Sequence, residues 1–220
     1  MKNIFAVGTG PGAAEYLTLQ AADVIKNAGV IFAPDNKGKH AALDTARPLI
    51  ENKKIILVNF PMGNVKPSDY KTAAEIIITN TPPDGSGVFL TIGDPLIYST
   101  FIYLMPYFEN REDINLKIIS GIPSFVAAAG KAKRPLTKKG ETLILADNFC
   151  EDILKNGETA VILKTAKGKQ NIIEKLENND FDYSYIKKLS MKGELILNQN
   201  DKEKILADQD YLSLIIANKK

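Results

Sequence analysis

The sequence has few of the residues from which disulfide frameworks and metal sites are built. Its 220 residues include one cysteine, Cys150, one histidine, His40, and no tryptophan. A single cysteine excludes an internal disulfide. Together with one histidine it supplies too few sulfur and nitrogen ligands for a zinc site. We therefore expect neither a disulfide framework nor a metal centre.

Long apolar segments and a strong excess of charge are also missing. No apolar run approaches the ~20 residues that cross a bilayer, and the chain starts with a strand pattern rather than a signal-peptide layout. The formal net charge of +2 is too small to indicate a nucleic-acid-binding protein. The composition, 45% hydrophobic and 25% charged, is ordinary for a globular protein. These features predict a cytoplasmic protein with no membrane or nucleic-acid partner.

Short apolar runs alternate with helical patterns along the first part of the chain. The runs that we interpret as strands lie at residues 3–7, 30–33, 54–60, 87–92 and 116–120. This alternation predicts an α/β fold with a mostly parallel sheet. One of the intervening helices is expected at residues 99–108.

A basic stretch at residues 131–140, which also contains a proline and a glycine, interrupts this pattern. Such a composition is typical of a domain boundary. We therefore expect an N-terminal α/β domain at residues 1–133, a linker at residues 134–140 and a smaller, mixed α/β domain at residues 141–220. A cleft between two such domains is the expected ligand site.

The most informative stretch, residues 91–101, reads Thr-Ile-Gly-Asp-Pro-Leu-Ile-Tyr-Ser-Thr-Phe and follows a buried strand pattern. Pro95 holds Asp94 extended and removes the next backbone donor. The Asp94 carboxylate and the Gly93 carbonyl are then presented at the carboxyl end of the strand, where open α/β sheets bind ligands. The alternative is an ordinary turn in which Asp94 caps the helix that begins near Ser99.

A glycine-rich turn, Gly-Thr-Gly-Pro-Gly at residues 8–12, follows the first strand. With Ala13 it fits a G-x-G-x-x-A pattern, and Asp35 follows the second strand, as in dinucleotide-binding folds. One alternative is therefore an NAD(P)-dependent oxidoreductase, and another is a non-catalytic nucleotide-binding module. Pyrophosphate binding, however, needs a helix that begins directly at the turn. Here the helical pattern begins only near Leu17.

Further motifs accompany these two turns: Leu-Thr-Leu at residues 17–19 and Ser-Gly-Ile-Pro-Ser at residues 120–124. In this order the motifs resemble those of the tetrapyrrole methylases. These are two-domain α/β enzymes that transfer a methyl group from S-adenosylmethionine to corrin and sirohaem precursors. The resemblance covers nearly the whole chain and implies the same fold, methyl donor and class of substrate.

Three details resemble one branch of this family. They are Val-Ile-Phe-Ala-Pro at residues 30–34 with Lys-Gly-Lys at 37–39, Phe-Pro-Met at 60–62, and Tyr-Ser-Thr at 98–100. That branch methylates C20 of precorrin-2 or its cobalt form, cobalt-factor II, in cobalamin biosynthesis. The resemblance thus implies a C20-methyltransferase that works as a homodimer. A related tetrapyrrole methylase with a different regiospecificity is the alternative.

The resemblance also implies positions for both ligands. The residues expected to bind S-adenosylmethionine are Gly93, Asp94, Ile97, Pro123, Ser124, Lys164 and Gly193. The residues expected to bind the tetrapyrrole are Pro11, Gly12, Lys37, Lys39, Tyr98, Ser99 and Thr100. The family usually has serine or threonine where Pro123 stands, so a contact there would be apolar or through the carbonyl.

The reaction needs little acid–base apparatus, because the sulfonium methyl is already activated and the acceptor carbon is electron-rich. The enzyme contributes mainly in-line placement and exclusion of water. The candidate bases for the final proton removal are Asp35, Tyr98 and His40. The substrate carries eight carboxylates, so some of the basic residues are expected to line its site. Besides Lys37 and Lys39, the candidates are Lys131, Lys133, Arg134, Lys138 and Lys139.

Overall fold

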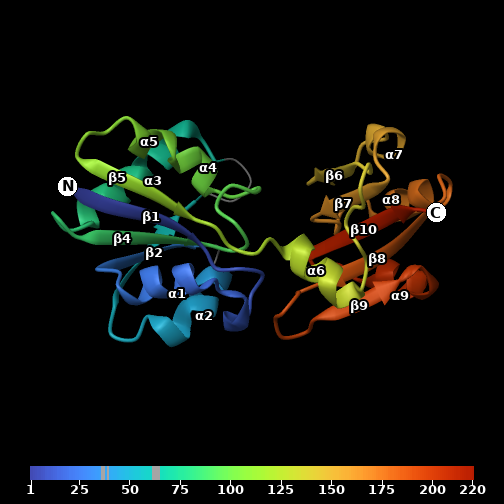
Figure 1. The fold of residues 1–220 in the computed structure, drawn as a ribbon, viewed down its shortest axis with the longest axis horizontal. Coiled ribbons are helices and arrows are strands. Elements are labelled where there is room, and N and C mark those ends of the chain that lie inside the picture. The colour runs from blue at the N-terminus through green and yellow to red at the C-terminus, as the bar shows by residue number, and fades with distance from the viewer. Residues whose placement is uncertain (36–37, 39, 61–64) are drawn as a thin grey trace. The chain divides into compact units, whose positions relative to one another are not determined.

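The computed structural model describes residues 1–35, 38, 40–60 and 65–220. By its contacts the chain divides into two compact units, Met1–Pro123 and Ser124–Lys220. Each unit contains one five-stranded sheet with helices packed on it (Figure 1). The predicted α/β fold class, a parallel sheet followed by a mixed one, is confirmed.

The first sheet is parallel throughout, with the strand order β3-β2-β4-β1-β5. Its strands are β1 (Lys2–Gly8), β2 (Val30–Asp35), β3 (Lys54–Asn59), β4 (Ser86–Thr91) and β5 (Ile114–Ile119). Because side chains alternate along a strand, the central strand β4 serves two cores. Phe89 packs in one hydrophobic cluster, and Val88 and Leu90 pack in the other.

Helices cover both faces of this sheet, with α3, α4 and α5 on one face and α1 and α2 on the other (Figure 1). The helices are α1 (Leu19–Lys26), α2 (Ala41–Ala46), α3 (Pro67–Asn80), α4 (Phe101–Leu104) and α5 (Pro106–Glu109), with 3-10 turns at Ala14–Tyr16 and Arg47–Leu49. The single helix expected at residues 99–108 is wrong. Pro106 has no N–H to continue the hydrogen-bond ladder, so α4 ends before it and α5 begins at it.

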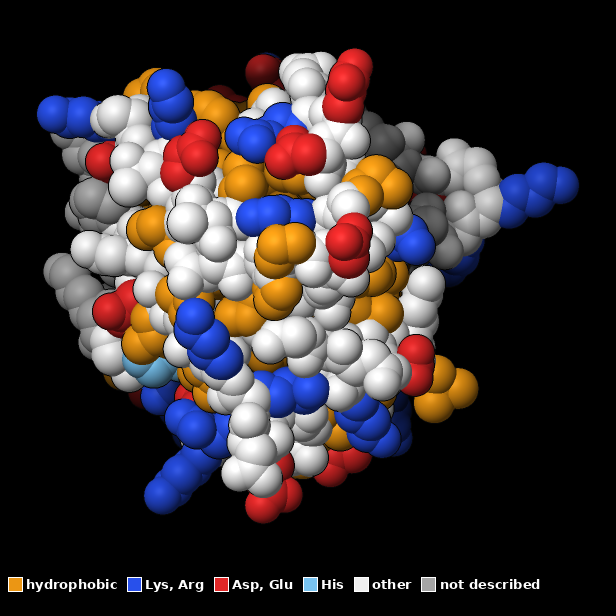
Figure 2. Space-filling view, turned by 90° about the vertical axis from the view of Figure 1, so that its left-hand side faces the viewer, with side chains coloured by type: hydrophobic (Ala, Val, Ile, Leu, Met, Phe, Trp, Pro, Cys, Tyr) orange, Lys and Arg blue, Asp and Glu red, His pale blue; other side chains and the backbone are white. Residues whose placement is uncertain are grey.

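Figure 2 shows the side of the first unit on which its strands begin. Acidic and basic side chains lie interspersed with hydrophobic ones on this face (Figure 2). The predicted site residues of this unit follow the carboxyl ends of the strands, at the opposite edge of the sheet.

The second sheet has the order β6-β7-β10-β8-β9, with one parallel pair, β6 and β7, and antiparallel pairs elsewhere. Its strands are β6 (Leu143–Ala146), β7 (Thr159–Leu163), β8 (Phe181–Lys187), β9 (Leu195–Asn198) and β10 (Ser213–Lys219). Its helices are α6 (Ser124–Ala132), α7 (Asp152–Asn156), α8 (Lys169–Glu177) and α9 (Lys202–Ala207), with a 3-10 turn at Gln199–Asp201. We did not expect α9, whose six residues are too few to show a clear helical period.

The two units divide at Pro123 and Ser124, before the basic stretch that we predicted as a linker. Helix α6 contacts β10 and therefore belongs to the second unit. Just after α6, the half-buried Arg134 donates from Nε to Ser184 Oγ at 3.1 Å and from Nη1 to Asn218 Oδ1 at 3.0 Å. These bonds fasten the start of the stretch to β8 and β10. The domain limits at residues 133 and 141 stay a prediction.

Replacing Arg134 by methionine is expected to destabilise the second unit by about 2 to 3 kcal/mol, because the buried Ser184 and the half-buried Asn218 lose a charged donor. Urea unfolding followed by circular dichroism measures this change. Arg111→Met is the matched control, since the Arg111–Asp113 ion pair lies at the surface, with 39% of the Arg111 side chain and 54% of the Asp113 side chain exposed. Equal losses for the two variants would contradict the role given to Arg134.

No helix in the described part of the chain is both long and apolar enough to cross a membrane.

Candidate functional site

The carboxyl ends of three adjacent strands, β4, β1 and β5, meet at Gly93, Gly8 and Gly121, which we call the glycine junction. A Cβ atom added to Gly121 would lie 2.1 Å from the Gly93 carbonyl oxygen, and one added to Gly8 would lie 2.5 Å from it. Such separations are far inside van der Waals contact. Only glycine therefore fits at Gly8 and Gly121, and the main chains of three loops lie directly against one another.

Glycine is needed at position 93 because of the backbone conformation there, and not because a side chain would lack space. Its φ is +71°, in the left-handed region, and a Cβ atom there would meet no atom of the described residues within 4 Å. The Gly93 carbonyl, which we predicted to be presented at the end of the strand, accepts the Gly10 N–H at 3.2 Å. The Gly93 N–H in turn donates to the Gly10 carbonyl at 2.8 Å. The open space beside Gly93 leaves room for a ligand to lie against bare main chain.

Asp94 fastens two of these loops to each other. Its Oδ1 accepts the Leu96 N–H at 2.8 Å, its Oδ2 accepts the Gly121 N–H at 3.1 Å, and the residue is 9% exposed. The helix-capping alternative for Asp94 is wrong, since Ser99 Oγ accepts the Phe101 N–H at the start of α4. The predicted contact of Asp94 with the methyl donor stays a prediction. Its hydrogen bonds give it a second role that the sequence did not predict, which is to position the loops after β4 and β5.

The Tyr98-Ser99-Thr100 segment combines one strained residue with one buried residue. Tyr98 has a φ of +46° and is 46% exposed. Left-handed backbone is unfavourable for an aromatic residue and often marks functional sites. Ser99 is buried, and its hydroxyl lies 3.1 Å from Thr91 Oγ1, so it positions the loop. Thr100 is half-buried and precedes α4. The substrate contacts expected of all three residues stay predictions.

Two backbone N–H groups of the glycine-rich turn donate hydrogen bonds within the protein. The Thr9 N–H donates to the Thr91 carbonyl at 2.9 Å, and the Gly10 N–H is engaged as described above. Helix α1 begins only after Thr18, whose Oγ1 accepts the Ala21 N–H at 3.1 Å. Two of the turn amides are therefore already engaged, and no α-helix N-terminus follows the turn directly, as pyrophosphate binding would need. The geometry gives the dinucleotide-binding alternative no support.

The two turn residues predicted to face the substrate are tied to helix α2. Pro11 is buried, and the carbonyl of the half-buried Gly12 accepts a hydrogen bond from Thr45 Oγ1 at 3.0 Å. Gly12 has a φ of +145°, a conformation that favours glycine. This hydrogen bond places the turn beside α2. The contact of Pro11 and Gly12 with the substrate stays a prediction.

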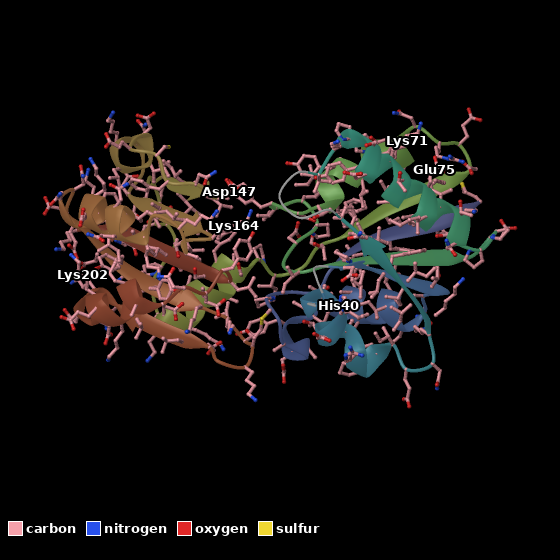
Figure 3. The ribbon with its side chains drawn as sticks, turned by 180° about the vertical axis from the view of Figure 1, so that it is seen from behind. His40, Lys71, Glu75, Asp147, Lys164 and Lys202 are labelled. Carbon is pink, nitrogen blue, oxygen red and sulfur yellow. The ribbon has the colours of Figure 1, made fainter. Side chains whose placement is uncertain are left out.

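Asp35 ends strand β2 at the same edge of the sheet. It is half-buried, accepts the Gly38 N–H at 3.2 Å, and its Oδ1 lies 4.0 Å from Nδ1 of His40, the residue labelled in Figure 3. His40 is itself half-buried rather than a fully exposed loop residue. Lys37 and Lys39 lie outside the described residues. The assignment of Asp35 as a base stays a prediction.

Of the residues expected to bind the methyl donor, Pro123 closes the first unit and Ser124 begins α6. Lys164 directly follows β7, has a φ of +56°, and donates from Nζ to Asp147 Oδ2 at 3.4 Å (Figure 3). Gly193, with a φ of +87°, lies between β8 and β9. Because β7 and β8 run in the same direction on either side of β10, Lys164 and Gly193 lie at one edge of the second sheet.

Several basic residues proposed as substrate ligands have protein partners instead. Lys131 Nζ lies 2.6 Å from Glu194 Oε2, and this bond lowers the pKa of the Glu194 carboxyl below its ordinary value despite partial burial. Lys138 lies 3.4 Å from Glu141, and Arg134 bonds β8 and β10. These three residues are thus paired within the second unit, and their contact with substrate stays a prediction.

Sequence reasoning missed the close approach of Gly8 and Gly121. Both glycines follow predicted strands, but a glycine suggests a turn as readily as a close contact, and which loops meet depends on the strand order. Reasoning also missed a stacked pair, Tyr70 and Tyr103, because neither residue belongs to a recognisable motif. The ring centroids of this pair are 5.0 Å apart with planes at 21°.

The fold and the glycine junction define an α/β protein in which main-chain loops form the edge at the carboxyl ends of the strands. The sequence profile of the tetrapyrrole (corrin/porphyrin) methylases matches residues 3–203. The chain therefore belongs to the tetrapyrrole methylases, which use S-adenosylmethionine as the methyl donor. The first unit fits a donor held by main chain, because the space beside Gly93 is open.

Comparison with individual proteins agrees with this assignment. The chain is 30% identical to a probable cobalt-precorrin-2 C(20)-methyltransferase of Methanocaldococcus jannaschii, over 98% of this chain and 96% of the relative. It is 30% identical to the cobalt-precorrin-2 C(20)-methyltransferase of Salmonella typhimurium, over 64% and 61%. The uroporphyrin-III C-methyltransferase of Thermus thermophilus, solved with S-adenosylhomocysteine, has the same fold, with a TM-score of 0.69, 16% identity and coverage of 98% and 97%.

Proposed function

We propose that this tetrapyrrole methylase methylates C20 of precorrin-2 or cobalt-factor II in cobalamin biosynthesis. The observation that carries the proposal is the similarity to the Methanocaldococcus protein along almost the full length of both chains. The Tyr-Ser-Thr segment at residues 98–100, with its strained Tyr98, supports the same branch. The alternative is methylation at another carbon, since proteins of this fold include a uroporphyrin-III methyltransferase.

The binding residues that we propose come from the family resemblance. Those for the methyl donor are Gly93, Asp94, Ile97, Pro123, Ser124, Lys164 and Gly193. Those for the tetrapyrrole are Pro11, Gly12, Lys37, Lys39, Tyr98, Ser99 and Thr100. Within these sets the geometry supports a positioning role for Asp94 and Ser99, whose side chains are buried and hydrogen-bonded. We also propose that the protein works as a homodimer, which light scattering of the purified protein would test.

The residues of the chain would act mainly by placement. When bound, S-adenosylmethionine would supply a methyl group on a sulfonium that needs no further activation. The glycine junction and Asp94 fix the loops after β4, β1 and β5 relative to one another, and a rigid edge of this kind lowers the entropic cost of an in-line geometry. Asp35 and Tyr98 are the candidate acceptors for the proton that leaves the methylated carbon.

Incubation with S-adenosylmethionine carrying a ¹³C-labelled methyl group, with precorrin-2 and cobalt-factor II in parallel, tests the proposal. The expected product has one additional methyl group, and its ¹³C signal is assigned to C20. A methyl group on any other carbon would overturn the regiospecificity while leaving the enzyme class intact. Calorimetry with S-adenosylhomocysteine and with NAD is the companion measurement, and binding of NAD alone would overturn the class.

A further inference from the structure

Two tyrosines outside the predicted site form a stacked pair at the surface of the first unit. Tyr70 and Tyr103 have ring centroids 5.0 Å apart with an angle of 21° between their planes. Tyr103 is 58% exposed, whereas Tyr70 is half-buried and its centroid lies 6.1 Å from that of Phe60. The pair thus has a solvent-exposed outer ring and an inner ring that rests on the aromatic core.

Both rings lie toward the carboxyl ends of the strands in the first sheet. Tyr70 is in the first turn of α3, which follows β3, and Tyr103 is in α4, which follows β4. In a parallel α/β sheet these helices begin near the carboxyl ends of the strands. Helical side chains tilt toward the N-terminus of their helix. The rings therefore lean toward the edge that carries the glycine junction.

The core behind the pair is rigid. Phe60 lies edge-on to Phe89 at 6.5 Å, and Phe89 contacts Phe101 at 5.9 Å. Phe89 and Phe101 are both fully buried. A ring placed on this support loses little conformational freedom when a ligand stacks on it. An exposed tyrosine without such support would offer a much less ordered surface.

The two phenol hydroxyls are available as hydrogen-bond donors. Among the described residues neither hydroxyl has a hydrogen-bond partner, whereas Tyr107 in α5 donates from its hydroxyl to the Pro67 carbonyl at 3.1 Å. Burial raises the pKa of Tyr70 above its ordinary value, with smaller contributions from Tyr103 and Asp69. Tyr70 therefore stays protonated near neutral pH and can donate to a carboxylate.

We propose that the Tyr70–Tyr103 pair is a stacking platform for the conjugated macrocycle of the methyl acceptor, with the phenol hydroxyls donating to its carboxylates. The proposal rests on the proposed function, because it takes the acceptor to be a tetrapyrrole. It assigns Tyr103 to positioning the acceptor and gives it no part in binding the methyl donor. Stacked aromatic contacts favour a flat, conjugated ligand over an aliphatic one of the same charge.

The kinetic test compares Tyr103→Ala with Tyr103→Phe. Loss of the ring is expected to raise KM for the tetrapyrrole about 5- to 30-fold, and loss of the hydroxyl alone about 2- to 5-fold. kcat at saturating tetrapyrrole should change less than KM. Tyr107→Phe is the matched control, because its hydroxyl is bonded within the protein, and its KM should equal that of the wild type. An unchanged KM in Tyr103→Ala would overturn the proposal.

A binding test without turnover keeps this inference separate from the proposed function. The chain has no tryptophan, so its intrinsic fluorescence comes from tyrosine, which a bound porphyrin quenches. Titration with uroporphyrin III should show weaker binding by Tyr103→Ala, while its calorimetric affinity for S-adenosylhomocysteine and its unfolding temperature stay at wild-type values. Weaker donor binding with unchanged porphyrin binding would assign the ring to the donor and refute the platform. Methylation at another carbon would refute only the proposed function.

Discussion

Replacing Gly121 by alanine is expected to destabilise the first unit by at least about 3 kcal/mol, because the new methyl group would overlap main chain on two sides. A Cβ atom there would lie 2.1 Å from the Gly93 carbonyl oxygen and 2.7 Å from the Gly8 carbonyl carbon. Backbone atoms cannot rotate away as a side chain can. The three loops would have to separate, so affinity for S-adenosylhomocysteine should also fall more than about 100-fold, or about 2.8 kcal/mol.

The matched control for this variant is Gly130→Ala. Gly130 lies in α6 and is exposed, and in the part of the chain that the structure describes no atom lies within 4 Å of a Cβ placed there. Alanine is favoured over glycine inside a helix, so this variant should be more stable by about 0.5 to 1 kcal/mol. Denaturant unfolding measures both variants, and calorimetry measures the affinity. Similar stabilities for the two variants would mean that the junction is less tight than the distances indicate.

Removing the Asp94 carboxylate is expected to have the second largest effect. In Asp94→Ala the buried N–H of Gly121 and the partly buried N–H of Leu96 lose their acceptor, which should cost about 2 to 5 kcal/mol of unfolding free energy. Affinity for S-adenosylhomocysteine should fall by one to two orders of magnitude, or about 1.4 to 2.8 kcal/mol. Unfolding in urea and calorimetry with S-adenosylhomocysteine measure the two effects separately.

The Asp94 experiment distinguishes positioning from direct contact. Asp94→Asn keeps one acceptor oxygen but turns an amide N–H toward the other donor, so an intermediate loss of stability is expected. If Asp94→Ala loses stability and keeps its affinity for S-adenosylhomocysteine, Asp94 would fasten the loops without touching the donor. Asp113→Ala is the control, because Asp113 is exposed and its ion pair with Arg111 lies at the surface.

The order of strands and helices was predictable because it depends on local patterns. The runs before Gly8 and Gly93 are continuous and apolar, as expected for strands of a buried parallel sheet. Pro106 illustrates a local signal that we underestimated, since the proline ends one helix and begins another. The mixed second sheet was harder to predict in detail, because short strands such as Leu195–Asn198 show little periodicity.

The candidate site was predictable only as far as its motifs. The Gly-Asp-Pro turn was located correctly, but the partner of Asp94 is Gly121, which is 27 residues away. Contacts of that kind depend on which strands are neighbours, and β1 separates β4 from β5 in the sheet. The hydrogen bonds of Arg134 were missed for a related reason, because a basic stretch suggests surface until its partners on β8 and β10 are known.

The glycine junction has a consequence for how such a protein can change. Because it is made of main-chain atoms, it offers almost no side chain whose exchange would leave the backbone undisturbed. The first turns of α3 and α4 present side chains at the same edge. Descendants of one ancestor can therefore acquire new acceptors by exchanging residues on these helices, without rebuilding the loops beneath them.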